Sequence, residues 1–365
     1  MTDRRDFLKK VGLGVAGLAT AGLVNASRSS AAKKNAKFKW KIAAAFPLTM
    51  VGLGPGVARF AKNVTELSGG ELEITAYGAG ELVPAMQVFD ATKQGSVIQM
   101  AASASYYWIG KMPASGFFTN WPFGMDSAGM MSWMYNGGGL ELWRELYAPS
   151  GVVPFPFMGD GMQMAGWFRK EIKSVDDLKG LKYRCPGIGG QVYARAGANV
   201  VTIPTGELYT ALERGIVDAV KMANPIIDMP MGYHQVAKYY YYPGWNEPGV
   251  IVELLINKKA WEYLPAHLQK IIDICSREQL ITTFCEFEAG NAKAIQGLLD
   301  SKKVELRKFP DDVIKLLKKH SIDIMNEAAA KDPSYKKIYD AAKAYNKMYN
   351  SWENVTKFAM TEKIY

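Results

Sequence analysis

Short apolar runs alternate with stretches of helical periodicity along most of the chain. Residues 41–46 form an apolar run that predicts a strand. Apolar positions in residues 57–67 recur with a period of about 3.6, which predicts a helix that stops at Gly69. The same alternation predicts further strands at 71–76, 96–101, 181–185, 200–203 and 217–220, and helices at 84–93, 190–196 and 207–214. Strands that alternate with helices are typical of α/β domains with largely parallel sheets.

One sequence pattern occurs twice, 120 residues apart. Residues 89–97 and 209–217 both read aromatic-x-Ala-x-x-x-Gly-x-Val, which predicts a helix end, a glycine stop and a strand. We therefore expect two similar lobes in one chain. Because ligands of such sheets bind outside the carboxyl ends of the strands, the crevice between the lobes is the expected binding place.

The C-terminal third has a different pattern. Long helical periodicities extend over residues 261–299, 310–330 and 335–365, and Asp332-Pro333 separates the last two. In the last helix, a stripe at three- and four-residue spacing consists of Tyr339, Ala342, Tyr345 and Tyr349. Such a stripe predicts a buried core or an interface with a partner rather than a cofactor site.

Residues 1–32 have the parts of an export signal. A charged start precedes residues 11–24, which are weakly apolar, and small-residue cleavage patterns follow. The apolar part is too short to span a hydrocarbon core of about 30 Å. The Arg4-Arg5 pair resembles the twin-arginine signal, although Asp3 leaves the general secretory route open. We therefore expect a periplasmic protein with a twin-arginine-like signal peptide.

Composition and charge exclude several classes of protein. The 365 residues are 48% hydrophobic and 22% charged, which permits a large core and excludes a disordered chain or a multi-span membrane protein. Removal of residues 1–32 takes away five basic and two acidic groups, so the formal charge falls from +9 to +6. The basic residues form no concentrated block, and we expect no nucleic-acid partner.

Few residues are available for metal, disulfide or enzyme chemistry. The chain has three cysteines and three histidines. Cys275 and Cys285 lie in one predicted helix, separated by a rise of about 15 Å that prevents a disulfide. Cys185 is expected as a buried free thiol. The sequence contains no nucleophile elbow, His-Glu-x-x-His, Cys-x-x-Cys or P-loop signature.

Two features favour a site for a small anion. Arg184 ends a predicted strand just before Pro186-Gly187 and a helix start, and guanidinium and helix-start N–H groups both attract carboxylates or sulfonates. An ordinary surface ion pair is the alternative for this arginine. Aromatic residues with polar tips follow at 106–108 and 239–247, where a pocket lining and a core are both open.

Four motifs stand in the order found in a known family. They are GELVP at residues 80–84, GMQMAGWFR at 161–169, DDLKGLKYR at 176–184 and YYYYPGWNE at 239–247. With these motifs, the chain resembles the extracytoplasmic solute receptors of TRAP transporters, the DctP family, from about residue 39 to the C-terminus. It is most similar to the branch that binds 2-oxoacids and lactate.

The resemblance implies an α/β, two-lobe fold like that of type II periplasmic binding proteins, with a long connecting helix and a C-terminal dimerisation helix. We expect lobe I at residues 38–160 plus about 250–290, lobe II at 161–249 plus about 291–330, and the C-terminal helix at 331–365. The implied partners are a small organic anion, the small and large integral membrane subunits of a TRAP permease, and a second copy of the chain in a homodimer.

The resemblance also implies the residues that hold the anion. Arg184 matches the arginine that clamps the carboxylate, and Gln163 matches a glutamine that contacts the substrate. Glu247 matches an acidic ligand of a sodium or calcium ion that bridges substrate and protein. The complete expected set is Arg184, Gln163, Lys221, Met222, Asn224, Tyr107 and Glu247.

One position departs from the family pattern. Where the branch has a Glu-Trp pair whose Glu also ligates the cation, this chain has Lys221-Met222. A protonated ammonium ligates no metal, but its charge equals the sum of a carboxylate and a divalent cation. We therefore expect Lys221 to replace the ion, paired with Glu247 and touching the anion. No cofactor is then expected, and Glu247 ligates a metal only if a cation binds. The alternative is that the Lys221 side chain extends to solvent and that the anion site lies elsewhere in the crevice.

The predicted function is a non-enzymatic periplasmic receptor. It closes over one small organic anion and delivers it to a membrane permease. Because Met222 removes a Trp wall and Lys221 adds a charge, a 2-oxoacid, a hydroxyacid and a small hydroxysulfonate all remain open as ligands. An exported cofactor-dependent enzyme acting on a small carboxylate is the alternative, and a structural or adhesion protein is a third possibility.

Overall fold

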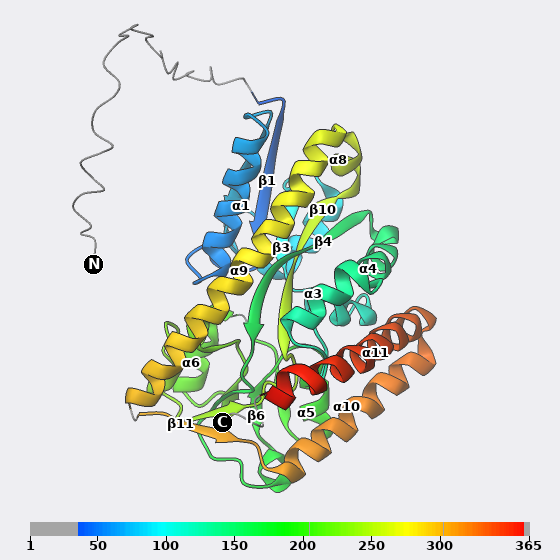
Figure 1. The fold of residues 1–365 in the computed structure, drawn as a ribbon. Helices are drawn as coiled ribbons and strands as arrows, with labels where there is room; N and C mark the ends of the chain where they lie inside the picture. The colour runs from blue at the N-terminus through cyan, green and yellow to red at the C-terminus, as the bar shows by residue number, and fades with distance from the viewer. Residues whose placement is uncertain (1–35, 204, 302, 361–365) are drawn as a thin grey trace, which may run out of the picture. The chain divides into compact units, whose positions relative to one another are not determined.

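Two β-sheets organise the described part of the chain. The computed structural model describes residues 36–203, 205–301 and 303–360 (Figure 1). The expected signal peptide at residues 1–32 lies outside these residues. Within them, no helix is both long and apolar enough to cross a membrane.

The first sheet has the strand order β2-β1-β3-β10-β4. Its strands are β1 (Phe38–Ala44), β2 (Leu72–Tyr77), β3 (Met100–Ser103), β4 (Val152–Met162) and β10 (Gly249–Asn257). β1 pairs in parallel with β2 and β3, as predicted. β10 is antiparallel to both β3 and β4, so the prediction of a largely parallel sheet is wrong on this side. The reason is topological, because the chain enters β10 from the second sheet rather than through a helical crossover.

The second sheet has the strand order β11-β9-β5-β8-β6-β7. Its strands are β5 (Gly166–Phe168), β6 (Lys182–Arg184), β7 (Asn199–Val201), β8 (Ala219–Val220), β9 (Tyr239–Tyr242) and β11 (Glu305–Lys308). β6 is parallel to β7 and β8, whereas β5 is antiparallel to β8 and β9. Parallel β6 and β8 end at the same edge, which places the residues after them side by side.

The α-helices connect and cover these strands. They are α1 (Leu53–Leu67), α2 (Val88–Gln94), α3 (Ser127–Asn136), α4 (Gly139–Tyr147), α5 (Gly187–Arg195), α6 (Leu208–Glu213), α7 (Pro225–Asp228), α8 (Lys258–Tyr263), α9 (Ala266–Ser301), α10 (Asp311–Lys331) and α11 (Pro333–Glu353). Short 3₁₀ turns include η2 (Ser105–Trp108) and η3 (Pro113–Phe118). The helix predicted at 261–299 is two helices, because Pro265 lacks an N–H and Leu264 before it is extended.

Local sequence signals explain several helix ends. Apolar residues of α1 such as Val57, Phe60 and Val64 are buried, and the helix ends just before Gly69, which has a positive φ. Gly95 after α2 and Gly215 after α6 also have positive φ values of 72° and 69°. The helix, glycine and strand order expected from the repeated pattern is therefore confirmed in both halves.

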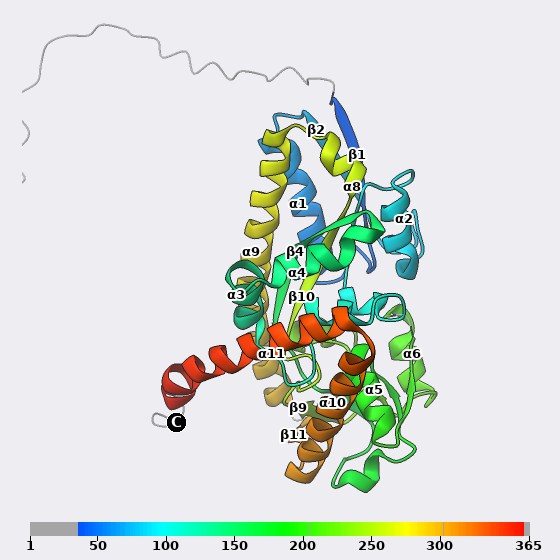
Figure 2. The same cartoon turned by 90° about the vertical axis from the view of Figure 1, so that its right-hand side faces the viewer.

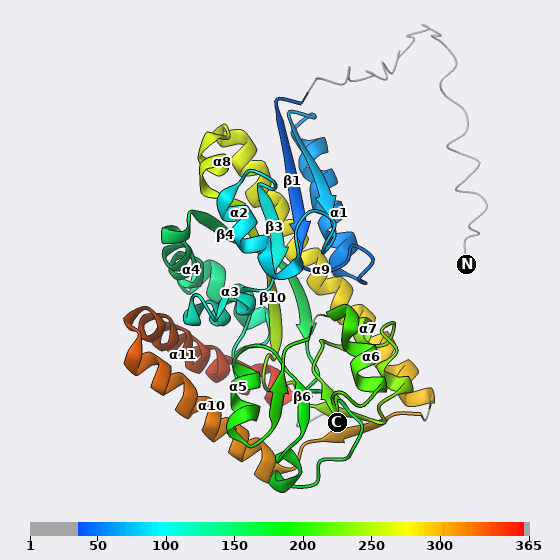
Figure 3. The ribbon, with the colours of Figure 1, turned by 180° about the vertical axis from the view of Figure 1, so that it is seen from behind.

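The long helix α9 links the two sheets. It packs against β4 and α1 of the first sheet's layer and against α7, which follows β8 of the second sheet. Figure 1 shows it running beside β4 toward β11, and Figure 3 shows the opposite face, with β1, β3 and β10 above α5 and β6. The expected connecting helix is present.

Helices α10 and α11 form an antiparallel hairpin (Figure 2). Asp332 separates them and caps α11 by accepting hydrogen bonds from the N–H groups of Ser334 and Tyr335. On α11, Tyr339 stacks on Phe117, and the tyrosine stripe packs onto α3 and η3 of the same chain. Within the described residues, this stripe is part of the core.

Candidate functional site

Four chain segments meet between the two sheets. Gln163 directly follows β4, Arg184 ends β6, Lys221 follows β8, and Glu247 lies shortly before β10. The parallel register of β6 and β8 places Arg184 opposite Val220, and the Lys221 N–H donates to the Arg184 carbonyl at 2.8 Å. The Gln163 N–H donates to the carbonyl of Pro248 at 3.1 Å. Backbone pairing therefore brings together residues that are far apart in the sequence.

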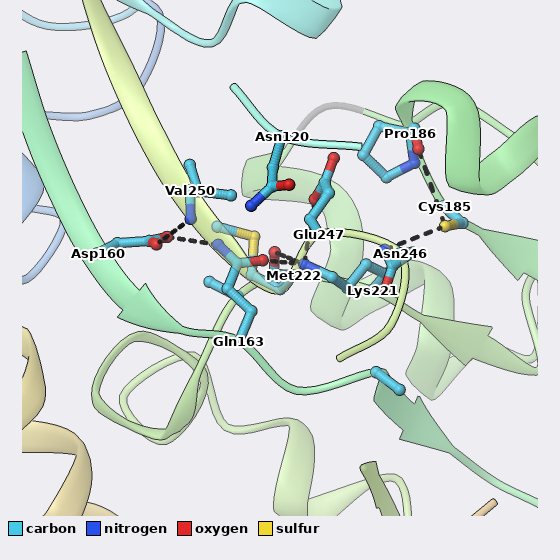
Figure 4. A network of polar contacts seen from close by, with 12 residues as sticks. Asn120, Asp160, Gln163, Cys185, Pro186, Lys221, Met222, Asn246, Glu247 and Val250 are labelled. Atoms are coloured by element: carbon cyan, nitrogen blue, oxygen red, sulfur yellow. Dashed lines mark hydrogen bonds and ion pairs between the residues drawn. The ribbon is translucent and has the colours of Figure 1, made fainter. Parts of the chain in front are cut away.

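Lys221 is the centre of this cluster. Its Nζ donates to Gln163 Oε1, to the Met222 carbonyl at 3.2 Å and to Glu247 Oε2 at 3.3 Å (Figure 4). The side chains of Lys221 and Glu247 are only 1% and 5% exposed. Burial raises the pKa of the Glu247 carboxyl above its ordinary value, and the charges of Lys221 and Arg184 oppose that rise. The expectation that Lys221 pairs with Glu247 agrees with this geometry, and the solvent-reaching alternative does not.

Arg184 is also buried. Its Nε donates to the Ile203 carbonyl at 3.2 Å and one Nη1 hydrogen goes to the Lys221 carbonyl at 2.6 Å. Among the described residues, its Nη2 has no hydrogen-bond partner. No carboxylate pairs with it there, so the surface ion pair considered for this arginine is not what the structure contains.

Two cavities adjoin the cluster. An outer cavity of about 410 Å³ is lined by Arg184, Thr202, Ile203 and Thr205 on one side and by Ala45, Pro84, Met86 and Tyr107 on the other. An inner cavity of about 50 Å³ is lined by polar Asp160 and Gln163 and by apolar residues that include Phe46, Met222 and Val250. Tyr107 and Thr205 line both. A larger surface hollow of about 640 Å³ lies between α5 and α10, where the Arg195–Glu327 ion pair neutralises itself.

The remaining expected residues have different positions. Met222 and Tyr107 line the cavities. Asn224 lines neither one; its Nδ2 donates to the Asp160 carbonyl at 2.5 Å. Lys221 is fully buried and also lines neither cavity, and its direct contact with the anion stays a prediction. It adjoins the inner cavity through Gln163 and Met222.

The structure bears on three further predictions from the sequence. Residues 239–242 form strand β9, and Tyr240 and Tyr241 are fully buried, so the core alternative applies to these two residues. At the start of α5, the nearby negative group is the carboxylate of Glu247 rather than a ligand. A Cβ atom placed on Gly187 would lie 3.4 Å from Glu247 Oε1. Cys185 is a buried free thiol, as expected, and burial raises its pKa to about 12.

Asp160 was missed by the sequence analysis. It is 3% exposed, its Oδ1 accepts the Val250 N–H at 3.1 Å, and its Oδ2 accepts a hydrogen bond from Gln163 Nε2. Burial raises its pKa to about 7. The available signal was a lone carboxylate within the apolar run of β4.

The oxygens around Lys221 resemble part of a cation site. Gln163 Oε1, the Met222 carbonyl and Glu247 Oε2 all face Nζ, and calcium would require six to eight such oxygens at about 2.3–2.6 Å. A positive nitrogen already stands among them. The described residues also contain no group of three or more His, Cys, Asp or Glu side chains that could hold a metal ion. A sodium or calcium ion at these oxygens would therefore have to displace the ammonium of Lys221.

Two α/β layers linked by a long helix, with buried cations beside a cavity between them, define a two-lobed solute-binding protein. Residues 52–332 match the bacterial extracellular solute-binding protein family 7, DctP. The chain belongs to this family.

Relatives from three organisms support this assignment. The chain is 40% identical over 321 residues to a monocarboxylate 2-oxoacid-binding periplasmic protein of Nostoc sp., covering 88% of this chain and 87% of that protein. A TRAP periplasmic solute-binding protein from Pseudoalteromonas atlantica, solved with sodium and pyruvate, is 38% identical with a TM-score of 0.87, covering 91% of this chain and all of the other. A TRAP solute-binding protein from Bordetella bronchiseptica, solved as a dimer with calcium and picolinate in one site, is 34% identical with a TM-score of 0.86, covering 90% and 97%.

Proposed function

We propose that this protein is the periplasmic solute receptor of a TRAP transporter and binds a small, singly charged organic anion between its lobes. The observation that carries the proposal is the pair of buried cations, Arg184 and Lys221, beside a cavity lined from both sheets. Relatives with bound pyruvate or picolinate have the same fold. The protein would deliver the anion to the small and large membrane subunits of the permease, and its signal peptide would provide export.

Lys221 takes the place of a metal ion in this proposal. The relatives hold sodium or calcium together with the anion. Here an ammonium faces Gln163, Glu247 and the Met222 carbonyl. The charges of Arg184, Lys221 and Glu247 sum to +1, and the ionised carboxylate of Asp160 brings the charge of the cluster to zero before the anion binds. That balance suits a 2-oxoacid, a hydroxyacid or a small hydroxysulfonate rather than a dianion.

The expected lobe limits remain part of the proposal. Strands of the first sheet fall within 38–160 and about 250–290 except for the last two residues of β4 and the first residue of β10, and most strands of the second fall within 161–249. Segments that cross between the sheets, near residues 161–165 and 243–249, would act as hinges when the lobes close. Closure would bring Tyr107 and Thr205, which line both cavities, around the bound anion.

The homodimer is also proposed. On the C-terminal helix and the turn after it, Met348, Trp352 and Val355 are 60%, 65% and 70% exposed and lie at helical spacing. A continuous exposed apolar stripe is typical of an interface, and the Bordetella bronchiseptica relative was solved as a dimer. A second copy of this chain is the occupant we propose.

Calorimetric titration with pyruvate, picolinate and a small hydroxysulfonate tests the receptor function. Arg184→Ala should weaken binding of the best ligand by about 30-fold or more, because removing one partner of a buried charge contact costs at least about 2 kcal/mol. Arg214→Ala, an exposed arginine at the end of α6, is the matched control. If Arg184→Ala binds as tightly as the wild type, the proposed site is wrong.

The same titrations test the role of Lys221 and the absence of catalysis. Addition of a chelator should leave the affinity unchanged, whereas Lys221→Glu should bind only when calcium or sodium is supplied. Strict dependence of the wild type on either ion would contradict the replacement. Product analysis after long incubation should recover the ligand intact; conversion of it would favour the enzyme alternative.

A further inference from the structure

A chain of four polar groups connects β4, β10 and the segment after β8. The Val250 N–H donates to Asp160 Oδ1, Gln163 Nε2 donates to Asp160 Oδ2, and Lys221 Nζ donates to Gln163 Oε1 (Figure 4). Every donor in this chain faces an acceptor. We call it the Asp160 relay, and it consists of Val250, Asp160, Gln163 and Lys221.

The carboxylate of Asp160 fixes which way the Gln163 amide points. An ionised carboxylate only accepts hydrogen bonds, so it selects the NH₂ end of the amide. The amide oxygen is then left for Lys221, which only donates. The reversed amide would place an oxygen against the carboxylate and an NH₂ group against the ammonium, and both contacts would be repulsive.

We propose that Asp160 is a positioning residue that sets the polarity of the anion site through Gln163. The NH₂ group of Gln163 has two hydrogens, and Asp160 takes one of them. Gln163 lines the inner cavity, so the second N–H remains for an oxygen of the bound anion. This inference rests on the proposed function, because the bound anion is the group that accepts a hydrogen bond from this N–H.

Asp160 is well placed for this role. It is 3% exposed, and Asn224 Nδ2 holds its backbone carbonyl at 2.5 Å. Among the described residues no lysine or arginine pairs with its carboxylate, so it is not one half of an ordinary ion pair. Asp160 itself lines the inner cavity, which means that a change of its hydrogen-bonding pattern acts directly at the anion site.

Two variants test the polarity of the relay. Asp160→Asn presents a mixed donor and acceptor to Gln163 and releases the amide orientation. We expect pyruvate affinity to fall about tenfold or more, and the urea midpoint of the ligand-free protein to fall as well. In the double variant Asp160→Asn with Gln163→Glu, the new asparagine donates to the new carboxylate, which still accepts from Lys221. The midpoint should therefore recover, while affinity stays low because a carboxylate at position 163 has no N–H to give.

Asp228→Asn is the matched control. Asp228 is another buried carboxylate, bonded to Trp167, Tyr240 and the Ala223 N–H, and it lines neither cavity. Its substitution should lower the midpoint and leave pyruvate affinity within about twofold of the wild type. An equal loss of affinity in Asp228→Asn would show that Asp160 acts only through stability.

The outcomes separate this inference from the proposed function. A wild type that binds no anion of the panel overturns the function, while the midpoint comparison, made without ligand, still tests the relay. Full wild-type affinity in Asp160→Asn overturns the positioning role. A double variant that is no more stable than Asp160→Asn, including one that does not fold, overturns the relay polarity.

Discussion

Two buried glutamates on either side of the start of β10 have opposite surroundings. Glu247 faces the ammonium of Lys221 and has Arg184 nearby. Glu253, fully buried within β10, faces three neutral donors: Ser103 Oγ at 2.6 Å, Trp108 Nε1 at 2.6 Å and Tyr147 OH at 3.1 Å. Burial raises the pKa of Glu253 to about 7, although the three hydrogen bonds oppose the rise.

The different surroundings of the two glutamates distinguish a candidate binding site at Glu247 from a structural contact at Glu253. The oxygens of Glu253 are satisfied by groups that join β10 to β3, η2 and α4, so this carboxyl ties the first sheet together. Around Glu247, by contrast, the donors are the charged Lys221 ammonium and the nearby Arg184 guanidinium, and the cluster adjoins two cavities. Buried cations beside a cavity indicate a place where an anion completes the structure. Burial of a carboxylate alone does not.

The largest effect is expected where the cation is removed. Lys221→Met leaves Glu247 buried without its partner and should lower the free energy of unfolding by about 3–5 kcal/mol at pH 7.5, measured by urea denaturation. Burial then raises the pKa of Glu247 unopposed by Lys221. Because a raised pKa in the folded state means that this state binds the extra proton, the loss should shrink toward pH 5.

Lys170→Met, at an exposed lysine, is the control for that measurement. Its urea midpoint should match the wild type at every pH. A Lys221→Met variant as stable as the wild type at pH 7.5 would mean that Glu247 needs no cation, and the two glutamates would then be equivalent.

The next effect concerns Glu253 and its response to pH. Its pKa is about 7 in the folded state and near 4.5 in the unfolded chain, so the folded state holds the additional proton between these values. The resulting stabilisation is complete below about pH 4.5 and is lost as the pH rises through 7, an amount of about 3 kcal/mol. Glu253→Gln cannot titrate, so the wild type should lose about this much relative to the variant between pH 4.5 and 8.

Denaturation of both proteins across this pH range measures the difference directly. Other raised carboxyls, Asp160 with a pKa of about 7 and Asp228 with about 6, change both proteins alike and cancel. Parallel stability curves would show that Glu253 has the same ionisation in the folded and unfolded chain.

The local parts of the fold were accessible from the sequence, and the long-range parts were not. Helix α1, the glycine stops at Gly95 and Gly215 and the break at Asp332 depend on neighbouring residues, and the structure has them. Strand β4 and the antiparallel course of β10 depend on pairing over about a hundred residues, which no local pattern encodes. The break at Pro265 is a local signal as well, but the helical periodicity continues on both sides of it and predicts a single helix.

The site shows the same division. Gln163, Arg184 and Glu247 were found through motifs of the family, and the unusual Lys221 stood out against that pattern. The sequence could not predict that Asp160 is the hydrogen-bond partner of Gln163. That contact requires the side chain of Gln163 to turn back toward β4, the strand that precedes it. Direct contact of Lys221 with the anion stays a prediction, and its ammonium contacts Gln163 and Met222, which line the inner cavity. Charges can be read from residue types, whereas the order of layers around a cavity cannot.

The smallest effect, and the sharpest control on the comparison, is expected for Tyr147→Phe. This change removes one of three hydrogen bonds to Glu253 while keeping the ring, which packs against Phe89 and Trp143. The loss should be about 1 kcal/mol above pH 7, where Glu253 is ionised, and smaller at pH 5, because a neutral carboxyl accepts weaker hydrogen bonds. Pyruvate affinity should stay within about twofold of the wild type, since Tyr147 lines neither cavity. A loss of affinity larger than the loss of stability would connect the Glu253 contacts to the anion site, and the two glutamates would belong to one network.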